Sequence, residues 1–216
     1  MSGAGSMTAV GAALVLACAT ASCRTAGGGA PLVQPGAPGE ASRAIAVRES
    51  VDVSHVGHTP ADVRFMQGMI GHHAQALEMT ALLPSRSHRA DMRLLAQRIE
   101  LSQADEITMM RRWLELRGQT SPSEHAHHAP GATLMPGMLS PEEMGRLATA
   151  TGAGFDRLFL ELLTKHHDGA LTMVRDLFAN PGAGQEPEIF AFASDIDADQ
   201  PIEIDRMSAM LTELLK

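Results

Sequence analysis

Cysteine is nearly missing from this sequence, and the copies that exist lie close to its beginning. Cys18 and Cys23 are the only cysteines among 216 residues. The rest of the chain therefore has no thiolate with which to hold a metal ion. A long thiol-free segment also suits an oxidising compartment, where free thiols would form disulfides.

Aromatic residues and positive charge are scarce as well. Aromatics make up 3% of the chain, tyrosine is absent, and the formal net charge is −8. Because there is no basic stripe to neutralise phosphates, we expect no nucleic-acid partner. Beyond residue 60 there is no period-two run of β-branched residues, whereas Ala, Leu and Met are common; this composition favours helices.

The beginning of the chain is typical of an export signal. Residues 7–21 are small and apolar, and this run is too short for a comfortable membrane span. We therefore predict a signal peptide over residues 1–23. No Lys or Arg precedes the apolar run, which leaves a merely disordered N-terminus as the alternative reading.

A lipid anchor is predicted at the end of this signal. TASC, ending at Cys23, resembles the lipobox of bacterial lipoproteins, and VLAC, ending at Cys18, is a competing site. Residues 24–60 are rich in Gly, Pro and Ala, so we expect a disordered, flexible tether there. The protein is thus expected in the periplasm or on the outer cell surface, with membrane contact only through the anchor.

The remaining sequence, residues 61–216, contains a duplication. DVRFMQGMIGHHAQALEMTALL, from Asp62, aligns without a gap with DRLFLELLTKHHDGALTMVRDL, from Asp156. A second pair follows, IELSQADEITMMRRWL from Ile99 and IDADQPIEIDRMSAML from Ile196. The domain is therefore built from two copies of one helix–helix hairpin.

Two helical hairpins bury their apolar stripes best against each other, so the duplication predicts an all-α four-helix bundle. We place the first hairpin at residues 61–117 and the second at residues 151–216, joined by a linker over residues 118–150. Within the linker, SPEE from Ser140 has the composition of a helix start and predicts a short helix over residues 141–149.

One face of the first predicted helix collects histidine and methionine. At about 100° per residue, Met69 and Met79 lie on the same arc as His72, with His73 at its flank. Glu78 lies nearly opposite and is expected to face solvent. The second copy repeats the histidine pair, so both pairs are expected to point into the bundle or flank its seams. The predicted metal ligands are Met66, Met69, His72, His73, Met79, His166, His167 and Met173.

A polar pair recurs inside the apolar stripe of the second helix of each copy. Buried polar groups need partners, and the histidines are the obvious candidates. These groups either orient the imidazoles toward a metal ion or bind it themselves; alternatively, they form a metal-free hydrogen-bond network that fixes the bundle's register. We favour the metal, because a network needs no thioether. The residues concerned, with the methionines beside them, are Gln103, Glu106, Met110, Gln200, Glu203 and Met207.

The linker carries a weaker pattern of the same kind, a short histidine tract followed by a Met-x-x-Met pair. Such a tract is a weak signal alone, and a solvated loop is the alternative. Beside a helix rich in His and Met, we interpret it as a metal-capturing segment. Its residues are His125, His127, His128, Met135 and Met138.

The ligand types favour copper. Di-iron bundles use Glu-x-x-His motifs, but Met69 stands at the glutamate position of the first copy and Leu163 at that of the second. Iron and manganese oxidase chemistry is therefore disfavoured. Thioether and imidazole suit Cu(I), with Ag(I) by analogy, and imidazole alone serves Cu(II).

Four motifs together resemble a known bacterial family. FMQGMIGHHAQALEM, QADEITMMRRWL, MPGMLS and HHDGALTM look like the family called domain of unknown function 305, over residues 63–211. The resemblance implies a ferritin-like four-helix domain that is exported, is often found with copper-resistance genes, and binds copper rather than catalysing a reaction. The family's motif residues correspond here to Met66, Met69, His72, His73, Met79, Gln103, Glu106, Met110, Met135, Met138, His166, His167 and Met173.

The second copy departs from the first. Leu160 and Leu163 replace two methionines, and Thr172 stands where Glu78 would repeat. Pro201 is expected to kink the last helix. The second hairpin is therefore expected to bind metal more weakly or to serve mainly as scaffold.

We expect an exported copper buffer or chaperone that acts in copper homeostasis or resistance, with a copper exporter or oxidase as its delivery partner. No nucleophile, base and acid combine in a recognisable constellation, so an enzyme is not expected. The alternatives are a ferritin-like metal-dependent oxidase and a metal-free structural bundle with a buried His–Gln–Glu network.

Overall fold

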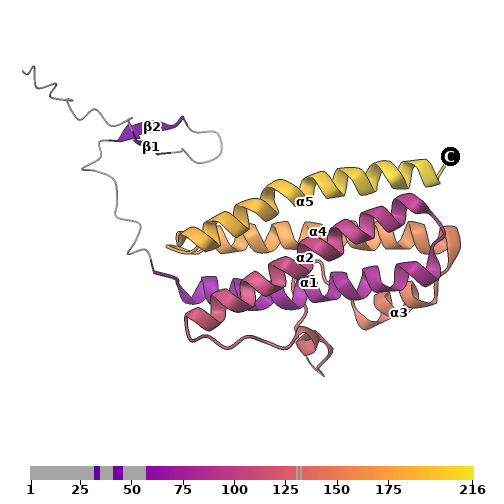
Figure 1. Ribbon diagram of the computed structural model, residues 1–216, viewed down its shortest axis with the longest axis horizontal. Coiled ribbons are helices and arrows are strands. Elements are labelled where there is room, and N and C mark those ends of the chain that lie inside the picture. Colours follow the sequence, from indigo (N-terminus) through magenta and orange to yellow (C-terminus); the bar gives the residue numbers. More distant parts are fainter. Residues whose placement is uncertain (1–31, 35–40, 46–56, 130, 132) are drawn as a thin grey trace, which may run out of the picture. The chain divides into compact units, whose positions relative to one another are not determined.

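The computed structural model describes residues 32–34, 41–45, 57–129, 131 and 133–216 (Figure 1). The chain divides into two compact units, Met1–Val51 and Asp52–Lys216. The predicted signal peptide, with Cys18 and Cys23, lies outside the described residues.

A two-stranded antiparallel hairpin lies in the first unit, within the predicted tether. It is formed by β1 (Leu32–Gln34) and β2 (Arg43–Ile45), and Leu32 is paired with Ile45. The sequence did not reveal these strands, because three residues are too few for a period-two pattern to be recognised.

The second unit is helical throughout its regular structure, as the duplication predicts. Helix α1 packs against α2, α4 packs against α5, and the two hairpins meet where α1 packs against α4. None of the helices that the structure describes is both long and apolar enough to span a membrane. The elements are α1 (Pro60–Arg86), α2 (Ala90–Leu116), the 3-10 helix η3 (Glu124–His128), α3 (Pro141–Thr149), α4 (Gly152–Ala179) and α5 (Pro187–Leu214).

Two helices in this unit begin with a capping box. Thr59 and Asp62 form a capping box at the start of α1, and Ser140 and Glu143 form another at α3. Asp62 also accepts a 2.7 Å hydrogen bond from the backbone N–H of Gly184 in the turn between α4 and α5. This bond ties the start of the first hairpin to the turn of the second.

Helix α5 continues through Pro201 without a break. Proline removes one donor from the hydrogen-bond ladder, but the residues on either side keep helical structure and the polar pattern stays in register. Pro201 therefore does not end the helix, and the predicted kink at this position stays a prediction.

The core consists of two apolar clusters with a polar layer between them. Along α1, residues up to Ala74 belong to the first cluster, and residues from Ala76 onward belong to the second. Along α4 the order is reversed, with Leu163 in the second cluster and Ala170 in the first. The two histidine pairs lie at this boundary.

Candidate metal centre

Four histidines form the centre of the polar layer. His72 and His73 on α1, and His166 and His167 on α4, are all fully buried. The rings of His72 and His166 face each other across the helix pair, with centroids 3.8 Å apart. The packing of α1 on α4 therefore brings the two histidine pairs together, as the sequence predicts.

Each outer histidine contacts a carboxylate from the neighbouring helix of its own hairpin. His73 Nε2 lies 2.5 Å from Glu106 Oε2 on α2, and His167 Nε2 lies 2.7 Å from Glu203 Oε2 on α5. A carboxylate accepts, so each of these Nε2 atoms donates and leaves Nδ1 free to bind a metal ion. The duplicated His–Glu pattern in the sequence is therefore a duplicated contact in the fold.

Glu106 is held in its charged form. Burial raises the pKa of this carboxyl, but the hydrogen bonds from His73 and Ser102 outweigh that effect and lower its pKa below the ordinary value. Ser102 Oγ donates to Glu106 Oε1 over 2.8 Å. An ionised carboxylate is the stronger acceptor for an imidazole N–H and makes that ring a more basic ligand.

The linker closes over the first of these histidines. His72 Nε2 lies 3.1 Å from the carbonyl oxygen of Pro136, so this ring also donates through Nε2. The loop reaches this position because two glycines meet backbone to backbone. A Cβ on Gly137, which has a φ of 77°, would lie 2.6 Å from the Cα of Gly169, and a Cβ on Gly169 would collide with the Pro136 carbonyl oxygen.

Several buried polar atoms in this layer have no hydrogen-bond partner. They are Nδ1 of His72, His73, His166 and His167, Nε2 of His166, and Oε1 of Gln103 and Gln200. A buried polar group without a partner costs roughly 1–3 kcal/mol. A cation bound by any of these atoms would satisfy them. Within the described residues, however, the group of three or more His, Asp or Glu ligand atoms that lie within 4.8 Å of one another is Glu78, His127 and His128, so side chains of the histidine layer would have to move to enclose an ion.

The central rings are neutral at physiological pH. Burial, followed by the neighbouring His73, lowers the pKa of His72 to about 3. Burial and the other three histidines lower the pKa of His166 well below its ordinary value. A neutral imidazole keeps the lone pair that a metal ion requires, and it does not repel the incoming cation.

The predicted methionines lie in the apolar clusters on either side of the histidines. Met66, Met69, Met110 and Met173 belong to the first cluster, and Met79 and Met207 belong to the second. Two of the predicted sulfur atoms accept hydrogen bonds: Met138 Sδ from the Met135 backbone N–H and Met207 Sδ from Thr164 Oγ1. Met135 and Met173 converge near Gly68, where an added Cβ would lie 3.1 Å from Met135 Sδ and 3.3 Å from Met173 Cε.

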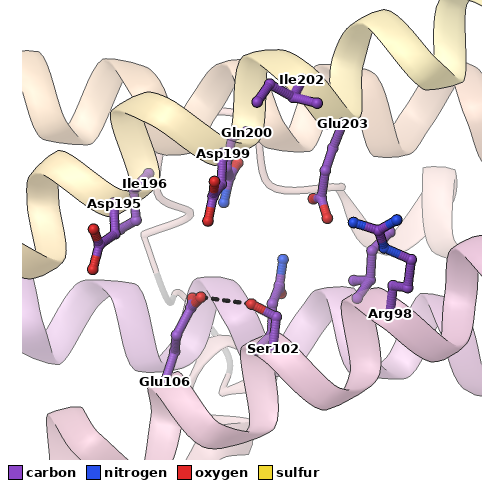
Figure 2. Close-up of a pocket in the computed structure, with 11 residues that line it drawn as sticks. Arg98, Ser102, Glu106, Asp195, Ile196, Asp199, Gln200, Ile202 and Glu203 are labelled. Carbon is purple, nitrogen blue, oxygen red and sulfur yellow. Dashed lines mark hydrogen bonds between the residues drawn. The ribbon is translucent and has the colours of Figure 1, made fainter.

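An acidic cleft leads to the layer between α2 and α5. Its cavity measures about 210 Å³, and Gln103, Gln200, Glu106 and Glu203 are among its lining residues. Figure 2 shows Glu106 on one wall and Glu203 on the other. The cleft is also lined by Arg98, Ser102, Asp195 and Asp199. Sequence reasoning missed these four, although each stands close to Gln103 or Gln200 in the sequence.

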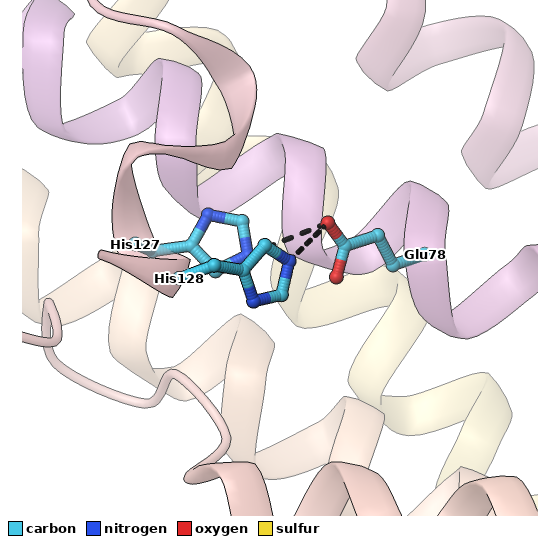
Figure 3. Close-up of side chains that lie close together, drawn as sticks. All are labelled: Glu78, His127 and His128. Atoms are coloured by element: carbon cyan, nitrogen blue, oxygen red, sulfur yellow. Dashed lines mark hydrogen bonds and ion pairs between the residues drawn. The ribbon is translucent and has the colours of Figure 1, made fainter. Parts of the chain in front are cut away.

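The histidine tract and the Met-x-x-Met pair of the linker lie at different places. Met135 and Met138 flank the loop that contacts His72, whereas the histidine tract forms η3 and contacts Glu78 (Figure 3). The expectation that Glu78 faces solvent is wrong: its side chain is only 23% exposed. A helical wheel assigns a face of one helix, and it does not show what the linker lays over that face.

The sequence from residue 62 to residue 211 matches the family described as "Domain of unknown function (DUF305)". The chain belongs to this family. The expected ferritin-like bundle and the resemblance on which it rested are thereby confirmed. Among functionally curated proteins, none matches this DUF305 chain.

Solved DUF305 structures share the architecture. A DUF305 fragment from Deinococcus radiodurans is 34% identical, with a TM-score of 0.61, and the match covers 72% of this chain and 98% of that one. A DUF305 protein from Streptomyces coelicolor is 30% identical, also with a TM-score of 0.61, and the match covers 71% of this chain and 93% of that one.

Two further structures are of a protein solved with copper. CopM in its Cu(II)-bound form is 25% identical to this DUF305 chain, with a TM-score of 0.59. CopM in its Cu(I)-bound form is 26% identical, with a TM-score of 0.57. Each match covers 70% of this chain and 96% of CopM. Copper association is therefore found among the structural relatives of this DUF305 protein.

Proposed function

We propose that this DUF305 protein binds copper in the histidine layer of its bundle and acts as a copper buffer or chaperone. The observation that carries the proposal is the meeting of four fully buried histidines whose Nδ1 atoms have no hydrogen-bond partner. In a purely structural core, such atoms would be a net cost.

The chemistry around the layer supports copper over a harder ion. Imidazole nitrogens bind both Cu(I) and Cu(II), and thioether sulfur favours Cu(I). Met69 precedes His72 by about one turn and is fully buried in the cluster beside it. The copper-bound forms of CopM, a protein of the same fold, agree with this choice. Copper is then the cargo that the protein holds and releases.

The carboxylates act on this cargo indirectly. Glu106 and Glu203 orient His73 and His167, and with Asp195 and Asp199 they make the cleft between α2 and α5 negative. A cleft of one charge sign raises the local concentration of the opposite ion and speeds its association. The cleft therefore serves as the route by which a cation reaches the imidazoles.

Titration with Cu(I) against a competing chelator tests the proposal. We expect the double variant His72→Ala/His166→Ala to lose at least about a hundredfold in affinity, equivalent to ~2.7 kcal/mol. His88→Ala is the matched control, because His88 is an exposed histidine in the turn between α1 and α2. Affinity that is unchanged in the double variant would contradict the proposal and favour the metal-free network.

The same preparations separate a binding protein from an oxidase. We infer that the protein stores or transfers copper. Oxygen consumption by the wild-type protein in the presence of Cu(I) should therefore equal that of the His72→Ala/His166→Ala variant. Faster consumption with the intact histidine layer would instead favour the ferritin-like oxidase. A copper exporter or oxidase is the expected recipient of the cargo.

We also propose that the protein works outside the cytoplasm, anchored by lipid at Cys23 or, failing that, at Cys18. The Streptomyces relative is named as a candidate secreted protein, which agrees with export. Metabolic labelling with a fatty acid, compared between the wild type and Cys23→Ser, tests the anchor, since loss of label in the variant is expected.

A further inference from the structure

We propose that Glu78, His125, His127 and His128 form a second metal site that takes a divalent ion of borderline hardness, Zn²⁺ or Cu²⁺, through nitrogen and oxygen. This site shares no residue with the histidine layer. Thr172 occupies the position of Glu78 in the second hairpin, so the site has no counterpart there.

Three histidine side chains converge on one oxygen atom of Glu78. Glu78 Oε1 lies 3.1 Å from His125 Nδ1, 3.5 Å from His127 Nε2 and 2.8 Å from His128 Nε2. Figure 3 shows the rings of His127 and His128 pointing toward the Glu78 carboxylate. The two histidines lie on η3, and Glu78 lies on α1. One ligand atom from each of these three residues lies within 4.8 Å of the others.

The distances from the Glu78 carboxylate are compatible with a shared metal ion. Ligand atoms about 2.0–2.1 Å from a tetrahedral Zn²⁺ lie roughly 3.3 Å from one another. The three separations from Glu78 Oε1 bracket this value, and the ligand atoms of Glu78, His127 and His128 also lie within 4.8 Å of one another; His125 lies outside that group and would have to move to join it.

His127 supplies a second and independent indication of a ligand. Its side chain is only 5% exposed, and neither of its ring nitrogens has a hydrogen-bond partner. Its Nε2 faces Glu78, and its ring lies against that of His128, with centroids 4.1 Å apart. A bound cation would satisfy the buried nitrogen that faces the carboxylate.

The backbone around the tract holds it in place against α1. Ser123 caps η3 by accepting a hydrogen bond from the His125 N–H, and Glu124 forms a 2.7 Å ion pair with Arg111 on α2. Gln67 on α1 donates a 2.7 Å hydrogen bond to the carbonyl of Thr120. The histidine tract is therefore docked on the bundle, which differs from the solvated-loop alternative.

The ligand set determines which ions fit. Three imidazoles and a carboxylate match the nitrogen and oxygen ligands of Zn²⁺, and imidazole also suits Cu²⁺. No thioether belongs to the group, so Cu(I) has less reason to prefer it. His125 and His128 are 69% and 54% exposed, which leaves the ion accessible to solvent and to exchange.

Zinc binding to the purified protein tests the site. The probe is Zn²⁺ alone, followed by calorimetry, with Co²⁺ as a spectroscopic substitute whose absorption reports tetrahedral nitrogen and oxygen ligands. We expect Glu78→Gln and His127→Ala each to weaken Zn²⁺ binding at least about tenfold. Glu142→Gln and His88→Ala, at exposed positions, are the matched controls and should bind as the wild type does.

The copper variants keep this test separate from the proposed function. His72→Ala/His166→Ala should retain the zinc site, and Glu78→Gln should retain Cu(I) affinity. Zinc binding that survives both Glu78→Gln and His127→Ala, or that disappears only with the central histidines, overturns the second site. Circular dichroism of each variant shows that lost binding is not lost folding; a folded Glu78→Gln protein with wild-type zinc affinity is sufficient to reject the site.

Discussion

The two hairpins repeat their imidazoles but not the surroundings of those imidazoles. His72 is hydrogen-bonded to the Pro136 carbonyl, whereas His166, its counterpart, has no partner on either ring nitrogen. Met66 and Met69 precede the first pair, and Leu160 and Leu163 precede the second. The comparison indicates that the nitrogen ligands depend on the duplication, whereas the two methionines before the histidine pair and the covering loop are specific to the first hairpin.

The largest expected effect is the dependence of the metal-free protein's free energy of unfolding on pH. The pKa of His72 is about 3 in the folded state against an ordinary 6.5, so between these values the unfolded chain binds more protons. The free energy of unfolding should therefore be highest above about pH 6.5 and fall as the pH drops toward 3, by ~1.4 kcal/mol per pH unit for each such histidine.

Urea unfolding between about pH 7 and pH 4 measures this slope. His72→Gln and His166→Gln should each reduce it, which shows how the two hairpins share the effect. His88→Gln, at an exposed position, should leave it unchanged. A stability that does not vary over this range would contradict the burial of neutral rings.

An intermediate effect on stability is expected from disturbing the contact between the linker and His72, which His166 in the second hairpin lacks. Gly169→Ala places a methyl group against the Pro136 carbonyl and should destabilise the protein by about 1–3 kcal/mol. Gly71→Ala, in the middle of α1 with no atom near the added Cβ, should instead stabilise it by about 0.5–1 kcal/mol. Thermal unfolding of the two variants measures both changes. Equal shifts in melting temperature would mean that the loop does not pack against α4.

The smallest expected effect is the change in Cu(I) affinity when methionine and leucine are exchanged in the two hairpins. Met66→Leu/Met69→Leu makes the first hairpin resemble the second and should weaken Cu(I) binding about tenfold, or ~1.4 kcal/mol. Leu160→Met/Leu163→Met is the reciprocal variant and should strengthen it. Such swaps nearly conserve volume, so the stability cost should stay below about 1.5 kcal/mol. Competition with a chelator measures the Cu(I) affinity of both variants. An affinity that is unchanged in both would show that these methionines only pack the core.

The fold was largely predictable because the duplication shows which residues of the two copies lie at the same level along the helices, as well as which residues are apolar. Once His72 aligns with His166 and Gln103 with Gln200, the polar residues of all four helices must fall at one level of the bundle. The short helix after Ser140 was equally readable, since its capping box is local in sequence.

The remaining features of the sites depend on contacts between residues far apart in the sequence. The Pro136 carbonyl reaches His72 because two glycines meet, and no pattern within either segment reveals that meeting. Glu78 was misassigned for the same reason, because its partners lie in η3. Asp195 and Asp199, which also line the cleft, were missed because a wheel for one helix does not show which neighbour stands opposite.

The gap between α2 and α5 has a consequence for speed as well as for affinity. Under the proposed function, a copper ion that enters this cleft would meet the carboxylates of Glu106 and Glu203, which line it, before the histidines that they contact. Release by this route would then proceed by ligand exchange rather than by unfolding of the bundle. Salt that screens the acidic walls should slow loading while leaving the final occupancy of the inner nitrogens much less altered.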